Sequence, residues 1–490
     1  MTSRRLDNLR YAPVCVYGAV FQRQTSLSIA SFDTVRRMDR ARITIKVAGL
    51  ALAAGLLIVS QVNAYIGDES LHLVAAQLIN AGKRPYADFF YHHTPLFIYL
   101  LANLMRLLGE NWRIAHAFSA TALAGAIILA CLYVRDLFVR EGSRLAAAAL
   151  AGLLLGTNCY VLIFATTGLP YGFLLFCLTA ALYFTNTAGS TYRLFFAGLC
   201  AGAAVSSYLL TLPALVVLVI WVLRRDRARV LVFAVGVLIA FGPLLVLFIE
   251  SPRQVAQGLF QYHLVNRPDL GWRYSLGELA AWFLSLQGAM LTVLSVVALY
   301  FRDDAKVRLC GWIALALSIG LAGVASVKTI DAMYLLLLTP FVTILAAVGT
   351  VEIAQRTSRH AKRVVALAAL MYLIGLYGIK DAWRWRATYT DYRVVEAIGN
   401  DLRTYTPDGG EFYAFEAVYF AVHRVPPPTL ENRFNPLSQA DERLKEGRFD
   451  AVCIGSTDPR VERNALFRRY SQSKEVNLSG YTWLILWDRK

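Results

Sequence analysis

The sequence is poor in charged residues and lacks the short motifs of several enzyme classes. Only 17% of its 490 residues are charged, whereas 57% are hydrophobic. A soluble domain has about a quarter charged residues. No P-loop is present, which argues against an ATP-driven pump, and neither GxSxG nor HExxH occurs. The seven cysteines include no CxxC pair, so neither a disulfide framework nor a zinc site is predicted.

The middles of the long apolar runs contain no Asp, Glu, Lys or Arg. Transporters that couple substrate movement to ions or protons need ionisable groups at membrane depth. The absence of such groups therefore disfavours a coupled transporter.

Those runs predict a polytopic all-α membrane protein, because many of them reach the length of a membrane span. Eleven spans are expected, at about 43–62, 113–134, 145–166, 169–186, 194–208, 209–223, 230–249, 279–300, 309–327, 333–350 and 364–380. A further apolar run, 95–109, is short for a crossing, and we interpret it as a re-entrant or juxtamembrane helix.

The charge distribution decides the topology. The net charge of +16 first suggests a nucleic-acid partner, but Lys and Arg gather in short loops between apolar runs, as the positive-inside rule predicts for a membrane protein. The loops 224–229, 302–308 and 356–363 are expected on the cytoplasmic side. The other basic segments agree with them only if 95–109 does not cross. The C-terminus is then outside, and the absence of an organelle signal favours the plasma (inner) membrane.

Three parts follow from this topology. Residues 1–42 form a basic cytoplasmic tail, partly disordered, in which Met38 is an alternative start. Residues 43–380 form the transmembrane region, with 63–112 as its first external loop. Residues 381–490 form a small extracytoplasmic α/β domain. In that domain EFYAFEAVYFAV, FDAVCIGS and YTWLILWD are predicted strands, and VVEAIGNDLRTY and ADERLKEGR are predicted helices.

The first external loop holds the strongest candidates for chemistry. Asp68 and Glu69 directly follow the first span and precede a helix-like run, ESLHLVAAQLINAG, in which His72 shares their face. Asp68 could simply be the N-cap of that helix. A carboxylate at a water–lipid boundary can instead have a raised pKa and act as a general base.

The same loop continues with an aromatic and histidine-rich segment, Tyr86 to Pro95. Its histidines, His92 and His93, could contact a phosphate or a hydroxyl. Its aromatic residues could stack on a sugar or anchor the loop at the membrane interface. Together with the acidic pair, the histidines could bind a divalent cation, but their spacing matches no standard metal motif.

Two later external segments carry cations, against the positive-inside trend. The loop 250–277 contains His263, Arg267 and Asp269, and a short link runs from Lys328 to Tyr334. Cations in such places suit an anionic lipid phosphate, or ordinary lipid headgroups.

The pattern GDES…AGKRPYADFFYHHTPLFIYLLANLMRLLG, followed by Arg113, resembles the C-superfamily of glycosyltransferases (GT-C). The branch it resembles includes protein O-mannosyltransferases and the lipid A aminoarabinose transferase. Those enzymes share an early acidic pair, a G-x-x-P-Y-x-D stretch and a following H-x-P-L segment. The resemblance is close over 63–115 and extends to about 350 by topology alone.

This resemblance implies transfer of a sugar from a polyprenyl-phosphate donor to an acceptor hydroxyl at the outer face of the membrane. The acceptor would be an envelope lipid such as lipopolysaccharide, a polysaccharide or a protein. Asp68 would be the general base, Glu69 would orient the acceptor or the base, and the reaction would invert the anomeric carbon. No cofactor is assigned. The donor phosphate would bind His93, Arg267 and Lys328. Residues expected to position the acceptor or the loop are His72, Tyr86, Asp88, His92, His263, Asp269 and Tyr334.

The sequence departs from the family at one place. Several relatives carry a second acidic residue in a small external loop that is here Thr166–Pro170, which has none. Either Asp269 or Asp331 replaces it, or the acceptor differs. Two alternatives to the enzyme remain open: a lipid or glycan flippase, and a non-catalytic envelope protein whose external domain binds partners.

Overall fold

The computed structural model describes residues 49–62, 65–186, 190–266, 270–356, 361–386, 388–389, 391–406, 410–436, 438, 440–446, 449–455, 470–478 and 481–487. Its contacts divide the chain into two units, Met1–Gly55 and Leu56–Lys490. The account below concerns the second unit. The predicted tail 1–42 and the candidates Arg267 and Asp269 lie outside the described residues.

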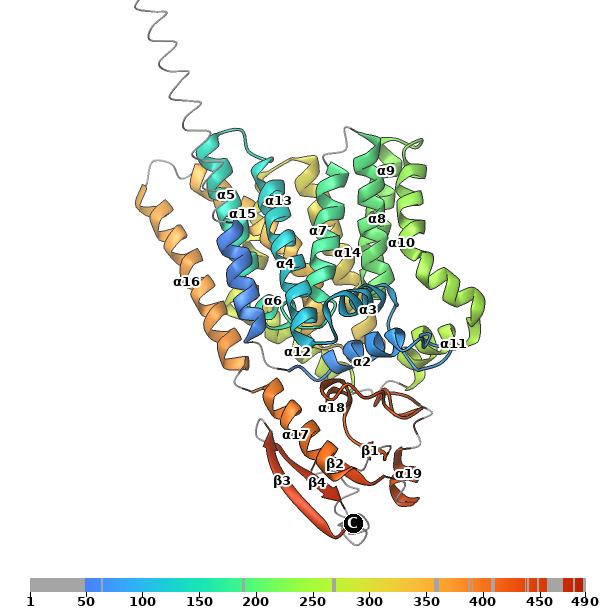
Figure 1. The fold of residues 1–490 in the computed structure, drawn as a ribbon. Coiled ribbons are helices and arrows are strands. Elements are labelled where there is room, and N and C mark those ends of the chain that lie inside the picture. Colours follow the sequence, from blue (N-terminus) through green and yellow to red (C-terminus); the bar gives the residue numbers. More distant parts are fainter. Residues whose placement is uncertain are drawn as a thin grey trace, which may run out of the picture. The chain divides into compact units, whose positions relative to one another are not determined.

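A helix occupies each stretch that the sequence predicts as a span (Figure 1). Beyond the short apolar helix Gly49–Gln61, these are α4 (Trp112–Arg135), α5 (Glu141–Gly156), α6 (Cys159–Phe164), α7 (Tyr171–Asn186), α8 (Thr191–Ser207), α9 (Leu212–Arg225), α10 (Val230–Glu250), α12 (Trp272–Leu284), α13 (Leu286–Phe301), α14 (Ala305–Val327), α15 (Thr339–Arg356) and α16 (Ala361–Arg386).

Some predicted spans consist of two helices. Asn158 caps α6 after a break from α5, and Ser285 caps α13 where it bends by 72° from α12. Among the described residues, four helices are long and apolar enough to cross a membrane, or five if the bent pair counts as one span. The chain is a multi-pass membrane protein, and the number of eleven crossings stays a prediction.

Short helical segments gather at one end of the long helices (Figure 1). They are α2 (Glu69–Asn80), α3 (Leu96–Leu108), η1 (Leu209–Thr211), α11 (Pro252–Ala256), the π-helix η2 (Gln257–Asn266) and η3 (Ala332–Leu338). The 13-residue α3 is the apolar run too short for a typical crossing. The predicted helix after Asp68 is confirmed as α2, which ends where Gly82 takes a positive φ of 82°.

The C-terminal segment, residues 392–487, combines helices with one four-stranded sheet. Its elements are α17 (Tyr392–Tyr405), β1 (Phe412–Tyr413), α18 (Glu416–Ala421), α19 (Ala440–Glu446), β2 (Ala451–Gly455), β3 (Gln472–Leu478) and β4 (Tyr481–Trp487). The strand order is β1-β2-β4-β3, with β1 and β2 parallel and the other pairs antiparallel. In the β2–β4 register Val452 lies opposite Leu486.

One strand prediction is largely wrong. In the run EFYAFEAVYFAV only Phe412–Tyr413 is a strand, and Glu416–Ala421 is the helix α18. An unbroken apolar run does not distinguish a buried strand from a buried helix. Here the helix is favoured because α18 packs on α2 and α17 and is buried on all sides, including at Val418, Tyr419 and Phe420.

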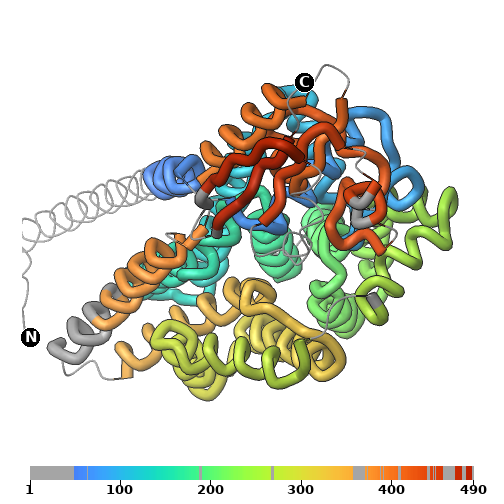
Figure 2. Tube along the Cα trace, turned by 90° about the horizontal axis from the view of Figure 1, so that it is seen from below, coloured from blue at the N-terminus to red at the C-terminus, as the bar shows by residue number. Residues whose placement is uncertain are grey.

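The C-terminal segment shares a continuous core with α2 and α3. Leu73 of α2, Phe97 of α3 and Ile485 of β4 belong to one cluster of buried apolar residues. The indole of Trp112 stacks on the ring of Tyr392, with centroids 4.4 Å apart and planes 6° apart. Figure 2, seen from below, shows the red and orange C-terminal segment over one side of the long helices, with the yellow α13–α14 region uncovered. The C-terminal segment is therefore fixed beside the first loop.

Candidate active site

Two adjoining cavities lie at the end of the helices where α2 and η2 meet. The larger, about 410 Å³, is called the apolar cavity and the smaller, about 230 Å³, the polar cavity. The apolar cavity is lined by His92, His93, Thr94, Tyr208, Leu209, Leu210, Leu259, Phe260, His263, Leu264, Gly320, Gly323, Val324, Val327 and Lys328. The polar cavity is lined by Asp68, His72, His92, His93, Leu169, Pro170, Tyr171, Tyr208, Tyr262, His263, Leu270, Thr329, Asp331, Met333, Tyr334 and Phe434. Four side chains line both.

Asp68 occupies the N-cap position of α2, but its side chain makes no capping hydrogen bond. Instead, Nη2 of Arg433 donates to its Oδ1 over 2.7 Å, and the carboxylate lines the polar cavity. The side chain is 39% exposed. The simple capping interpretation of Asp68 therefore does not explain where its carboxylate lies.

Glu69 points away from the polar cavity and is fully buried. Its Oε1 lies 2.5 Å from Nε2 of His116 in α4 and accepts a hydrogen bond of 3.0 Å from the backbone N–H of Gly168. Nδ1 of His116 faces the carbonyl of Ser60 at 2.8 Å and must donate to it, because a carbonyl only accepts. Nε2 then either accepts a hydrogen bond from a protonated Glu69 carboxyl group or, as part of an imidazolium, donates one to the carboxylate. The acidic pair is thus split between two environments.

The small loop Thr166–Pro170 meets this buried carboxylate. A Cβ on Gly168 would lie 2.6 Å from Oε1 of Glu69, so this position has no room for a larger residue. Leu169 and Pro170 line the polar cavity. The loop that lacks its own acidic residue therefore binds Glu69 from the first loop.

His72 is buried on α2 and hydrogen-bonds through Nδ1 to the hydroxyl of Tyr91 at 2.9 Å. Burial lowers the pKa of the His72 imidazole to about 3, so the ring is neutral at physiological pH. Its centroid is 5.4 Å from that of His93. His72 consequently contributes a neutral polar wall to the polar cavity.

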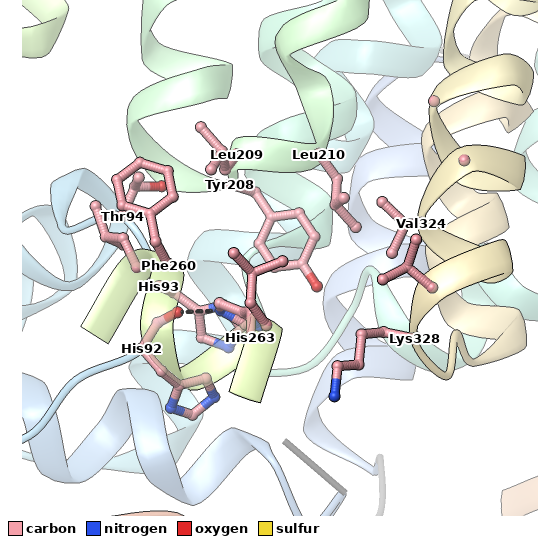
Figure 3. A pocket seen from close by; sticks show the side chains of 15 residues that line it. His92, His93, Thr94, Tyr208, Leu209, Leu210, Phe260, His263, Val324 and Lys328 are labelled. Atoms are coloured by element: carbon pink, nitrogen blue, oxygen red, sulfur yellow. Dashed lines mark hydrogen bonds between the residues drawn. The ribbon is translucent and has the colours of Figure 1, made fainter. Parts of the chain in front are cut away.

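Three histidines separate the two cavities. The rings of His92 and His93 have centroids 4.2 Å apart, and Nε2 of His263 donates to the backbone carbonyl of His92 over 2.6 Å. Figure 3 shows His263 reaching toward His92 from η2, with Leu209 and Leu210 on the opposite side of the apolar cavity. This wall brings the loop 86–95 and the loop 250–277 together, as the sequence-based site requires.

Tyr86 and Asp88 shape the loop and line neither cavity among the described residues. Tyr86 has a positive φ of 65°, and its hydroxyl donates to the carbonyl of His93 over 2.5 Å. Asp88 accepts from the guanidinium of Arg84, and this contact holds the pKa of the Asp88 carboxyl below its usual value. Tyr86 is therefore positioned to support the histidine wall through His93, whereas Asp88 pairs within its own loop.

The link after α14 contributes to both cavities. Lys328 lines the apolar cavity, and its ammonium makes no hydrogen bond or ion pair with any described residue. Figure 3 shows Lys328 reaching from the wall opposite His92 and His93, with its ammonium at the same lower end of the view as these histidines. Asp331 and Tyr334 line the polar cavity with Asp68. Of the two residues considered for the missing acid, Asp331 thus faces the candidate base.

Sequence reasoning missed several residues of the site. Phe434 lines the polar cavity, and Asn432 donates to Nδ1 of His92 over 3.4 Å. Together with Arg433 they come from the C-terminal segment, more than 300 positions from the first loop, where no spacing could reveal them. His116 carries a signal that could have been used, since an isolated histidine in an apolar helix is unusual. In the part of the chain that the structure describes, no three His, Cys, Asp or Glu side chains are grouped to hold a metal ion.

No protein-family model and no curated protein sequence matches this chain. Among solved structures, ArnT from Cupriavidus metallidurans bound to undecaprenyl phosphate is similar, with a TM-score of 0.64 and 14% identity over 90% of this chain and 97% of that chain. Its apo form gives 0.63, at 14% identity over 91% and 98%. The oligosaccharyltransferase AglB from Archaeoglobus fulgidus, in complex with an inhibitory peptide and a dolichol-phosphate, gives 0.54, at 13% identity over 83% and 69%.

The chain has the GT-C fold. The resemblance found in residues 63–115 is thereby confirmed at the level of the fold. Because the sequence identities are low, the similarity supports a common arrangement of the helices but does not identify a donor or an acceptor.

Proposed function

We propose that this GT-C protein is a glycosyltransferase that moves a sugar from a polyprenyl-phosphate donor to an acceptor hydroxyl. The observation that carries the proposal is the junction of the two cavities. An apolar cavity whose described lining includes the cation Lys328 adjoins a polar cavity lined by the carboxylate of Asp68, and the two share a wall of histidines. An isoprenoid phosphate needs the first environment, and a sugar that meets a hydroxyl needs the second.

The apolar cavity suits the donor lipid. Exposed apolar side chains at its rim, including Phe260, Leu264 and Val327, would face acyl chains. The Lys328 ammonium would bind the phosphate, and His93 would donate a further hydrogen bond. Both solved relatives named above hold a polyprenyl phosphate in one structure, undecaprenyl phosphate in ArnT and dolichol-phosphate in AglB, which supports this donor class.

Asp68 would be the general base. The acceptor oxygen attacks the anomeric carbon and forms the new glycosidic bond, while the bond between that carbon and the phosphate oxygen breaks. The proton of the acceptor hydroxyl moves to Asp68, and the lipid phosphate leaves toward Lys328. Direct displacement inverts the anomeric configuration. Glu69 would position α2, and a well-placed base contributes about 10²–10⁴-fold to the rate.

The second carboxylate would be Asp331. It lies in the polar cavity with Asp68, and Oδ1 accepts from the hydroxyl of Tyr274 at 3.4 Å. We assign it to the acceptor or to the sugar hydroxyls, in the role that relatives give to the acidic residue missing from Thr166–Pro170. Envelope glycolipids such as lipopolysaccharide, polysaccharides and proteins are the acceptor classes to be tested.

The direction of three helices supports a site at the outer face. The helices α4 and α9 begin beside the site and end with Arg135 and Arg225, whereas α14 begins after Arg302 and ends at Lys328. The basic loops thus lie at the end of the helices opposite the cavities. Since basic loops stay in the cytoplasm, the cavities and the C-terminal segment would face outward at the plasma membrane.

The test compares envelope glycolipids, glycans and glycoproteins by mass spectrometry in a deletion strain and in the same strain carrying wild type, Asp68→Asn or Asp401→Asn. Asp401 is the control because its carboxylate forms an exposed ion pair with Lys474, outside both cavities. We expect a sugar-sized mass that returns with wild type and Asp401→Asn but not with Asp68→Asn. Full return with Asp68→Asn would exclude the base, and no covalent difference at all would favour a flippase or a binding protein.

A further inference from the structure

The carboxylate of Asp68 is held on one side only. Nη2 of Arg433 donates to Oδ1 over 2.7 Å, whereas Oδ2 accepts no hydrogen bond from any described residue. The same carboxylate lines the polar cavity. One oxygen is therefore fixed, and the other is available to a ligand.

Arg433 is itself held in place by α18. Its backbone N–H donates to Oε1 of Glu416 over 2.6 Å, and Nη1 lies 4.0 Å from Oε2 of the same carboxylate. The guanidinium also lies over the ring of Phe434, 4.9 Å from its centroid. Glu416 is buried on a helix that packs against α2. The helix that carries Asp68 and the helix that holds Arg433 are thus packed together.

Neighbouring residues tie the same stretch to the other half of the first loop. The backbone N–H of Phe90 donates to Oε1 of Glu431 over 3.2 Å, and the amide of Asn432 donates to the carbonyl of Phe90 over 3.4 Å. Burial raises the pKa of the Glu431 carboxyl. Residues 431–434, which we call the clasp, therefore contact Asp68 at one end of the loop and Phe90 and His92 at the other.

We propose that Arg433 is a positioning residue that orients Asp68, so that the clasp completes the active site from the C-terminal segment. This inference rests on the proposed function. By fixing Oδ1, Arg433 directs Oδ2 toward the acceptor hydroxyl without touching donor or acceptor. A displacement of about 1 Å at a reacting group can lower a rate about 10²-fold.

The experiment measures how fast the sugar-modified product accumulates in the deletion strain after induction of wild type, Arg433→Ala, Arg433→Lys or Arg443→Ala, per amount of folded protein. Arg443 is the matched control, because it lies in the same segment and pairs with Glu411 away from the cavities. We expect the rate of product accumulation to fall about 10²-fold in Arg433→Ala. Arg433→Lys should keep a substantial part of the wild-type rate, and Arg443→Ala should match it.

Two further measurements separate orientation from donor binding and from folding. Undecaprenyl phosphate should bind purified Arg433→Ala as tightly as wild type in detergent, with an unchanged thermal midpoint. In isolated membranes, added guanidinium ion should raise the rate of Arg433→Ala, whereas sodium at the same ionic strength should not. If the alanine variant does not fold, the rate of Arg433→Lys and its affinity for undecaprenyl phosphate decide instead.

Three results would overturn the inference. They are a rate for Arg433→Ala equal to or above wild type, a parallel loss of undecaprenyl phosphate affinity, and a failure of both lysine and guanidinium to restore any rate. The first would make the ion pair dispensable or inhibitory, and the second would make Arg433 a donor ligand. An absence of product in wild type would instead count against the proposed function, so the two failures are distinct.

Discussion

Nε2 of His116 lies 2.5 Å from Oε1 of Glu69, and both side chains are fully inaccessible to solvent. The pair joins α2 to α4 one residue after the candidate base. Since Ser60 fixes the imidazole from its other nitrogen, the pair defines where α2 begins.

Replacing His116 by Ala should destabilise the protein strongly, because it leaves the buried Glu69 carboxylate without its imidazole partner. Removing one partner of a buried pair lowers the free energy of unfolding by about 3–5 kcal/mol. Thermal unfolding in detergent measures the effect. Ser119→Ala is the control on the same helix, since it removes only a hydrogen bond to Leu169, worth about 1 kcal/mol. Equal losses in the two variants would contradict a special role for the pair.

Because of His72, the free energy of unfolding should depend on pH. Its folded pKa is about 3, whereas an unfolded histidine titrates near about 6.5. Between these values the unfolded state binds more protons, so stability rises with pH by at most about 1.4 kcal/mol per unit. This contribution is complete above about pH 6.5 and is lost as the pH falls toward about 3.

Thermal midpoints from about pH 7 down to about pH 4 should therefore fall less steeply in His72→Asn than in wild type. An exposed histidine, His423, provides the control variant His423→Asn, which should keep the wild-type slope. If the thermal midpoints of His72→Asn and wild type fall in parallel as the pH is lowered, the lowered pKa assigned to His72 is wrong.

Lys328→Ala should weaken the binding of undecaprenyl phosphate by about 10–100-fold, because a hydrogen bond to a charged group contributes about 1.5–3 kcal/mol. Lys328→Arg should retain most of the affinity. The neutral alcohol undecaprenol should bind all three proteins alike, which native mass spectrometry or calorimetry can measure. Lys83→Ala, outside both cavities, is the charge-matched control. A loss for the alcohol as large as for the phosphate would point to packing instead of charge.

Gly323→Leu should fill part of the apolar cavity without disturbing the fold. Gly323 lines that cavity, and a Cβ placed on it meets no atom within 4 Å. We expect at least about a 10-fold loss of undecaprenyl phosphate affinity with an unchanged thermal midpoint. Gly277→Leu is the control, because Gly277 is also a helical glycine with open space around it but lines neither cavity. This variant should bind undecaprenyl phosphate as tightly as wild type. Unchanged affinity in Gly323→Leu would place the lipid elsewhere.

Several parts of this arrangement could be predicted from the sequence. The apolar runs predicted spans at stretches where the structure has helices, and the short run 95–109 corresponds to the short helix α3. The motif around Asp68 gave the GT-C fold. Both succeed because hydropathy and local spacing act over a few turns of chain, where sequence order and spatial order coincide.

The two halves of the acidic pair show what local pattern cannot decide. Asp68 and Glu69 are adjacent, yet one lines the polar cavity beside Arg433 and the other is buried against His116. Which carboxylate faces the polar cavity depends on how α2 is oriented and on the partners that packing brings to each of its sides.

By itself, then, the sequence determined a multi-pass helical protein, because spanning hydrophobicity and loop charge are properties of short segments. Its first loop also carries the motif that resembles the GT-C superfamily. Only the tertiary structure decided that the C-terminal segment supplies Arg433 and Phe434 to the site, and that Asp331 lies in the same cavity as Asp68. Contacts between residues hundreds of positions apart arise from the packing of whole helices, and no local spacing encodes them.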